Sequence, residues 1–307
     1  MNSFLDESHE IDFARPQERR EALLLLVRSA DPRQRQAQID RILADLQRAE
    51  GIGSLMWVVR HRGRIAGAVH AQVHPGRSAS LTIPQVVAGQ PDAIRRQLLL
   101  TVVDHAQRSG VRLVQTLLEI DHGPDVELLS SAGFTHVTDL LYLVSSQKNF
   151  PDQPPVGPLA FWPVARDQFE HLAHLVERTH VGTLDCPQLN AVRTPSDVLV
   201  GYEGSGTFDP ARWLIVRHAG DDVGCLLLTE HPGQQWEVLY LGLVPEARGR
   251  GWGITLTRYA QHLAQLGGAK RLLLAVDAEN APAIAMYAEA GFVAWDRRSV
   301  FLRIFPA

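Results

Sequence analysis

The feature that most constrains the fold of this chain is a weak internal repeat. The tripeptide Ala-Gly-Phe occurs at 132–134 and again at 290–292, 158 residues later. The same offset places Gly110 on Gly268, and an offset of 157 places His-Pro-Gly at 74–76 on His-Pro-Gly at 231–233. Short matches in the same order at a nearly constant offset indicate a tandem duplication. We therefore expect two copies of one fold.

A proline-rich segment separates the two copies. Residues 147–158, QKNFPDQPPVGP, carry four prolines and a glycine between two strand-like stretches. This composition is typical of an interdomain linker. The halves on either side have about 150 residues each, a common domain size. The sequence predicts a first domain at 1–147, a linker at 148–158 and a second domain at 159–307.

The composition is that of a soluble globular protein, with 45% hydrophobic and 21% charged residues. A net charge of −4 leaves no basic footprint for nucleic acid. The N-terminus has no leader pattern and the chain has no long apolar run, so we expect a cytoplasmic protein without a membrane partner. Two cysteines, Cys186 and Cys225, exclude a disulfide framework and a cysteine zinc site. No metal is expected, and the oligomeric state stays open.

The second half alternates strands and helices. Two apolar runs at 212–218 and 223–229 flank a Gly-Asp-Asp turn and predict a hairpin. Apolar residues at helical spacing predict a helix from near Gly251 to the glycines at 267–268. The other predicted elements are strands at 235–244, 271–276 and 299–304 and a helix at about 282–289.

A glycine-rich turn lies between the predicted strand and helix, in LGLVPEARGRGWGITL. In this arrangement backbone amides and the positive end of a helix dipole converge on an anion. Three glycines let the backbone approach closely and two arginines add positive charge. No Gly-Lys-Ser/Thr follows and the dinucleotide Gly-x-Gly-x-x-Gly spacing is absent. On the glycines alone, a phosphate loop and a flexible turn remain equally open.

Two motifs give this half a family resemblance. Arg248, Gly251 and Gly253 resemble the pyrophosphate-binding signature Gln/Arg-x-x-Gly-x-Gly/Ala of the GNAT superfamily of N-acetyltransferases. Asn280, Ala283, Tyr287 and the Gly-Phe pair at 291–292 follow the order and spacing of the second GNAT motif. The two motifs together cover most of the second half, and the duplication extends the fold to the first.

The resemblance implies an α+β, three-layer α/β/α fold, with two GNAT-like domains that each hold a mixed, largely antiparallel sheet between helices. It implies acetyl-CoA as the acyl donor, bound where the strand at 237–244 splays from the strand at 271–276. The cofactor-binding residues that it implies are Leu241, Leu243, Val244, Arg248, Gly249, Arg250, Gly251, Trp252, Gly253, Ile254, Asn280 and Tyr287.

The first half resembles a degenerate copy. At the offset of 158, Gln90 stands for Arg248, but Ala93 and Arg95 stand for Gly251 and Gly253. His122 and Leu129 stand for Asn280 and Tyr287. An arginine where the backbone must approach a phosphate argues against cofactor binding in this half. The sequence therefore predicts one active site, in the second half.

Tyr287 is the candidate general acid, because family resemblance places it to protonate the departing thiolate; the other interpretation is that it only packs against the cofactor. A backbone amide near Leu243 is expected to polarise the thioester carbonyl. Glu237 is the candidate general base, because alternation puts it on one strand face with Leu241 and Leu243, and because family resemblance matches it to the basic glutamate of the histone acetyltransferase branch. Binding of substrate or pairing with an arginine is an equally open role for Glu237.

The acceptor site is expected in the parts that the family varies, here 182–206 and a last hairpin at 295–299. The candidate acceptor-binding residues are Asp185, Asn190, Arg193, Tyr202 and Asp296. The function that fits best is transfer of an acetyl group to a primary amine, on a small molecule or a protein N-terminus. The alternative is a non-catalytic module that binds acyl-CoA or a partner protein on the same scaffold.

Overall fold

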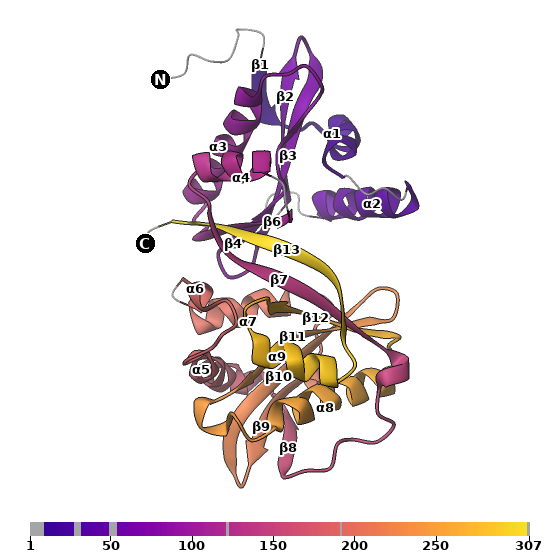
Figure 1. Ribbon diagram of the computed structural model, residues 1–307. Coiled ribbons are helices and arrows are strands. Elements are labelled where there is room, and N and C mark those ends of the chain that lie inside the picture. Colours follow the sequence, from indigo (N-terminus) through magenta and orange to yellow (C-terminus); the bar gives the residue numbers. More distant parts are fainter. Residues whose placement is uncertain (1–8, 28–31, 49–53, 121–122, 191, 306–307) are drawn as a thin grey trace. The chain divides into compact units, whose positions relative to one another are not determined.

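The computed structural model describes residues 9–27, 32–48, 54–120, 123–190 and 192–305 (Figure 1). The chain divides into two compact units. The first unit comprises Met1–His136 together with Val300–Ala307, and the second comprises Val137–Ser299. Among the described residues, no helix is both long and apolar enough to span a membrane.

The first unit holds a sheet with helices on both faces. Its strands lie in the order β1, β2, β3, β4, β6, and the end of β13 lies next to β6. Only the β4–β6 pair is parallel among the recorded registers of this unit. Val58 and Ala68 pack with α1 and α2, whereas Trp57, Val59 and Val69 pack with α3. The elements are β1 (His9–Phe13), α1 (Arg19–Leu26), α2 (Pro32–Arg48), β2 (Ser54–His61), β3 (Arg64–His74), β4 (Ser78–Leu81), β5 (Gln85–Val86), α3 (Asp92–Arg108), β6 (Leu113–Glu119) and α4 (Gly123–Ser131).

The second unit has the strand order β7, β12, β11, β10, β9, β8, with β13 on the other side of β7. Its β11–β12 pair is parallel, and β12–β7, β11–β10, β10–β9 and β9–β8 are antiparallel. The elements are β7 (Thr135–Ser146), β8 (Leu159–Pro163), α5 (Phe169–His180), α6 (Pro187–Asn190), α7 (Pro195–Glu203), β9 (Trp213–His218), β10 (Asp221–His231), β11 (Gln235–Leu243), α8 (Trp252–Leu266), β12 (Arg271–Asp277), α9 (Ala281–Glu289) and β13 (Val293–Ile304).

The second unit therefore has three layers. Trp236, Val238 and Leu272 pack against α8 and α9, which Figure 1 shows side by side. Trp213, Ile215 and Leu227 pack on the other face with α5 and α7. The predicted hairpin forms between β9 and β10 because Ala219 and Gly220 both take positive φ values, as a tight hairpin turn of this kind requires. The predicted α+β class is confirmed.

The two halves of the sequence repeat the same elements. β3 and β10 have 11 residues each and begin 157 residues apart, at Arg64 and Asp221. β6 and β12 have 7 residues each and begin 158 residues apart. The pairs α4–α9 and β7–β13 also match in length, at 9 and 12 residues, with the same 158-residue offset. The predicted tandem repeat is confirmed.

The unit boundaries differ from the predicted domain boundaries. β7 lies before the predicted linker, yet Leu140–Ser146 pairs with Asp277–Arg271 of β12 and so belongs to the second unit. In return, Phe301 and Phe305 lie in the core of the first unit. The last strand of each half thus completes the other unit. The expected hairpin at 295–299 is wrong for the same reason, because β13 runs unbroken through these residues beside β7.

Candidate active site

A cleft opens in the sheet of the second unit where β11 leaves β12. The two strands pair in parallel at Gln235–Glu237 and Arg271–Leu273. Opposite β10, the register shifts between Leu227, which faces Tyr240, and Leu228, which faces Val238. Leu239 is therefore an extra residue in a β-bulge, and a bulge bends its strand. Beyond it lies a cavity of about 820 Å³ between β11 and the end of β12. The predicted splay of these strands is present.

The glycine-rich turn closes one end of this cavity. Gly249 and Gly251 have φ values of 74° and 73°, a left-handed conformation that glycine adopts without strain. Gly251 is the N-cap of α8. Gly253 has ordinary helical geometry, but a Cβ atom there would lie 2.6 Å from the Met286 sulfur. The first amides of α8 have no partner within the helix and lie at the cavity, as an anion site requires.

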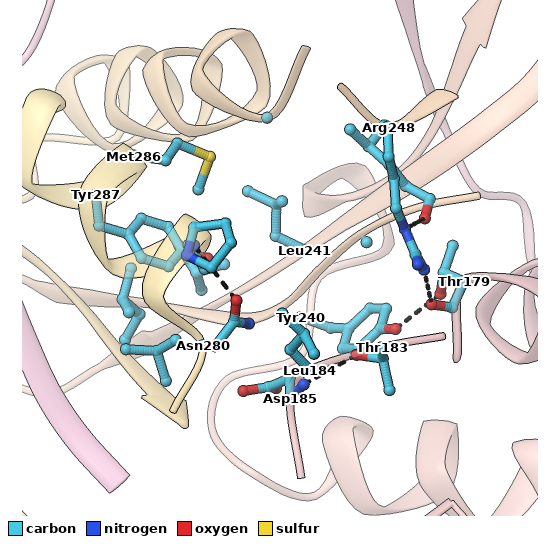
Figure 2. A pocket seen from close by; sticks show the side chains of 18 of the residues that line it. Thr179, Thr183, Leu184, Asp185, Tyr240, Leu241, Arg248, Asn280, Met286 and Tyr287 are labelled. Atoms are coloured by element: carbon cyan, nitrogen blue, oxygen red, sulfur yellow. Dashed lines mark hydrogen bonds between the residues drawn. The ribbon is translucent and has the colours of Figure 1, made fainter. Parts of the chain in front are cut away.

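Arg248 holds the turn in place. Its guanidinium donates to the carbonyl oxygens of Leu243 at 3.1 Å, Thr179 at 2.8 Å and Gly182 at 3.0 Å. Figure 2 shows this side chain beside Thr179, at the end of α5. The family resemblance implies that the positive charge of Arg248 binds the pyrophosphate. In the structure its side chain also links the turn to α5. Arg250 lies over the Trp252 ring at 5.0 Å and lines a separate hollow with Arg178 and Arg217.

Tyr287 and Asn280 lie on the α9 side of the cavity (Figure 2). The Asn280 side chain accepts a hydrogen bond from the Ala283 amide at 3.3 Å and so caps α9. Tyr287 is 7% exposed and lines the cavity. Burial raises the pKa of its phenol, and the charge of Asp185 raises it further. The phenol therefore stays protonated at neutral pH, as a general acid must.

Asp185 meets the end of β12 through two hydrogen bonds between chain segments. The Asp277 amide donates to Asp185 Oδ1 at 3.0 Å, and the Cys186 amide donates to Asp277 Oδ2 at 3.1 Å. Desolvation raises the pKa of Asp185, and the Asp277 charge adds to the shift. The same surroundings raise the pKa of the Cys186 thiol to about 12, so this cysteine is a thiol and not a nucleophilic thiolate.

Sequence reasoning missed Asp277, although it is 3% exposed and accepts from Thr138 Oγ1 at 2.7 Å. A carboxylate at the end of the apolar run RLLLAV is the signal that points to it. Tyr240 was missed as well; its hydroxyl bonds Thr179 Oγ1 at 2.7 Å. His180, at the end of α5, also lines the cavity, and desolvation lowers its pKa.

The predicted site residues fall into two groups. Most of them line the cavity. Four lie elsewhere: Val244 and Arg250 line the separate hollow, Asp296 pairs with Arg298 at 2.8 Å, and Glu237 bonds His231 Nε2 through Oε2 at 2.6 Å. The side chain of Asn190 lies outside the described part of the chain. Those that line the cavity are Leu241, Leu243, Arg248, Gly249, Gly251, Trp252, Gly253, Ile254, Asn280, Tyr287, Asp185, Arg193 and Tyr202.

The strand-face argument for Glu237 is wrong. Val238 and Leu241 both pack with α8 and α9, although simple alternation would put them on opposite faces. The bulge at Leu239 shifts the alternation, so Glu237 shares its face with Tyr240 and not with Leu241. The role of Glu237 as a general base stays a prediction.

The first unit fills the matching position with an ion pair. Arg95, which stands where the second half has Gly253, donates to the Pro84 carbonyl at 3.1 Å and pairs with Asp125. Gln90 bonds His9 at 3.0 Å, and Leu129 is fully buried. His122 lies outside the described residues. Within the described ranges, no cluster of His, Cys, Asp and Glu side chains has the arrangement of a metal site.

Comparison with known proteins agrees with this geometry. Residues 181–292 match the acetyltransferase (GNAT) family. The chain is 37% identical over 95 residues to a mycothiol acetyltransferase of Arthrobacter sp., a match that covers 29% of each protein. It is 27% identical over 283 residues to a mycothiol acetyltransferase of Thermobifida fusca, which covers 84% of each.

Solved structures match the whole chain. A GCN5-related N-acetyltransferase from Sphaerobacter thermophilus aligns over 98% of this chain and 97% of its own, with a TM-score of 0.66 and 18% identity. A tandem GNAT protein from the clavulanic acid biosynthesis pathway aligns over 97% and 99%, with a TM-score of 0.54 and 16% identity. The chain therefore has the tandem GNAT fold, and its residues 181–292 match the GNAT acetyltransferase family.

Proposed function

We propose that the protein transfers an acetyl group from acetyl-CoA to an amine, in one active site in the second unit. The observation that carries the proposal is the single cavity that joins the glycine-rich turn at Gly249–Gly253 to Tyr287. A phosphate-binding end and a proton donor in one cleft are the two parts that direct acetyl transfer from a thioester needs.

The pyrophosphate of the donor would lie at the start of α8, where backbone amides and the helix dipole favour an anion. The thioester would lie along β11, where a backbone amide near Leu243 polarises its carbonyl. The neutral amine nitrogen attacks the carbonyl carbon, the C–S bond breaks, and Tyr287 gives its phenolic proton to the departing sulfur. The new amide nitrogen then gives up its extra proton to the Tyr287 phenolate, which restores the phenol. Placing both substrates in one cleft is worth up to about 7–11 kcal/mol in favourable systems. Glu237 takes no part in these steps.

The alternative is a non-catalytic module that binds acyl-CoA. Consumption of the acetyl-CoA thioester separates the two functions, measured by thiol release with a panel of amines and the full-length protein. The panel includes the amine precursor of mycothiol, because the aligned relatives carry the name mycothiol acetyltransferase. Amine-dependent thiol release supports the enzyme. Tight binding of acetyl-CoA without thiol release from any amine supports the binding module.

The first unit is proposed to bind no acetyl-CoA. On α3, the Arg95 side chain and its ion pair with Asp125 occupy the position that Gly253 holds on α8 of the second unit, where there is no side chain. Its β4 ends at Leu81, and the chain then returns through β5 to pair with β3 at Gly67 and Ala68. The long splayed strand that walls the cleft in the second unit is thus replaced by a short strand and a return.

A further inference from the structure

The wall of the active-site cavity contains an arginine without a counter-ion. Arg193 lies in the chain between α6 and α7 and lines the cavity. Its Nε atom is buried without a hydrogen-bond partner. Among the residues that the structure describes, no carboxylate lies within ion-pair distance of it. The charge of Asp197 raises its pKa. Desolvation lowers the pKa of Arg193, which shows that its surroundings disfavour the charge that it carries.

A carboxylate without a cation faces the same cavity. Asp185 accepts one hydrogen bond, from the Asp277 amide to Oδ1, and no Lys, Arg or His in the described ranges pairs with it. The charge that raises its pKa beyond desolvation is that of another carboxylate, Asp277. Asp185 and Tyr287 line the same cavity, and the Asp185 charge raises the pKa of the Tyr287 phenol.

The two unpaired charges flank one tyrosine. The charge of Asp185 raises the pKa of Tyr202 and the charge of Arg193 lowers it, so both act on this ring. The Tyr202 hydroxyl has no hydrogen-bond partner among the described residues, and the side chain lines the cavity. A buried charge without a partner raises the free energy of the folded protein, and this cavity holds one such charge of each sign. A ligand that carries both complementary groups removes both costs.

We propose, on the basis of the acetyltransferase function above, that the acceptor is a small amino-carboxylate whose carboxylate pairs with Arg193 and whose amine faces Asp185. The planar guanidinium matches a carboxylate in two parallel hydrogen bonds. The ammonium group of the acceptor gives a proton to the Asp185 carboxylate. The neutral nitrogen then attacks the thioester carbonyl, the C–S bond breaks, and the sulfur takes the Tyr287 proton. The new amide nitrogen gives up its second proton to the Tyr287 phenolate, which restores the phenol, and Asp185 returns its proton to water.

The acceptor class is tested with matched pairs of probes. The full-length protein and acetyl-CoA are assayed for thiol release with the proteinogenic amino acids and β-alanine, each beside its neutral amide. We expect a carboxylate acceptor for which kcat/KM exceeds that of its amide at least 100-fold. Arg193→Gln should lower kcat/KM for the carboxylate acceptor about 100-fold, mainly by raising KM. It should leave kcat/KM for the neutral amide, and the Kd of acetyl-CoA, unchanged. Arg193→Lys should restore part of the loss.

Three outcomes would overturn this assignment. The first is equal use of acids and amides, and the second is an equal effect of Arg193→Gln on both. The third is acetyl-CoA binding without turnover of any amino-carboxylate. A protein that does not bind acetyl-CoA at all would instead refute the proposed function. Arg166→Gln, which breaks an exposed pair with Glu203, is the control for loss of an arginine.

The role of Asp185 has its own readout. Asp185→Asn should lower kcat at neutral pH at least tenfold and abolish the low-pH limb of the kcat profile. In the unmodified protein, kcat should fall as the pH falls through the raised pKa of Asp185, because a protonated carboxyl group cannot accept a proton from the acceptor ammonium. Glu203→Gln, which changes a partly exposed carboxylate on α7, should leave the profile unchanged. A low-pH limb that survives in Asp185→Asn refutes the base role.

Discussion

Tyr287→Phe is expected to lower kcat about 100-fold, the lower end of the range for general acid catalysis, while the Kd of acetyl-CoA changes less than twofold. The substitution removes one oxygen and keeps the ring, which packs with Phe292 at a centroid distance of 5.6 Å. Burial keeps the phenol protonated, so its contribution to the rate should persist to the alkaline end of the assay range. Single-turnover kinetics and calorimetry measure the two quantities.

Tyr259→Phe is the matched control for this substitution. Tyr259 lies on α8, stacked on Phe161 at 3.7 Å, outside the cavity. It should leave kcat unchanged. If Tyr287→Phe keeps full turnover, or if it weakens acetyl-CoA binding as much as it lowers kcat, then Tyr287 only packs against the donor and the proton comes from solvent.

Arg248→Ala is expected to lower the free energy of unfolding by about 3 kcal/mol, because three carbonyl oxygens lose a charged donor. Hydrogen bonds to charged groups are worth about 1.5–3 kcal/mol each, and three that share one side chain do not add fully. Urea denaturation followed by tryptophan fluorescence measures the loss. The Kd of acetyl-CoA should rise as well, since the turn loses its anchor on α5.

Arg250→Ala tests the same charge in the same turn without the clamp. Arg250 is exposed and packs over Trp252. Its loss should change the free energy of unfolding by less than about 0.5 kcal/mol. Equal destabilisation by the two substitutions would show that the three carbonyl contacts of Arg248 contribute little.

Local patterns in the sequence were sufficient for much of the site. The strand, the glycine-rich turn and α8 follow one another within the 32 residues from Gln235 to Leu266. The glycines at 249 and 251 have the left-handed conformation that a glycine-rich turn favours. Asn280 and Tyr287 also depend on local sequence alone, because Asn280 is the N-cap of the nine-residue helix α9 and Tyr287 lies on the buried face of that helix. The repeat was visible because three pairs of strands, β3 with β10, β6 with β12 and β7 with β13, have equal lengths and so keep the offset between the copies nearly constant.

Features that depend on pairing between distant segments were not predictable from the sequence. The bulge at Leu239 is set by register with β10, and it puts Glu237 on the strand face opposite to that of Leu241. The exchange of β7 and β13 depends on which half offers each strand its partner. The partners of Arg248 and the isolation of Arg193 and Asp185 arise only when α5 and the loop after it fold against β11 and β12.

The central claim is that the chain holds one acetyl-CoA, at the start of α8. Calorimetric titration of the full-length protein tests it most directly, with Gly251→Val in the second half and Ala93→Val at the equivalent place in the first. We expect one acetyl-CoA per chain, at least tenfold weaker binding in Gly251→Val, whose φ of 73° strains a β-branched residue, and unchanged binding in Ala93→Val. Two molecules per chain, no binding, or weaker binding in Ala93→Val alone would contradict the claim.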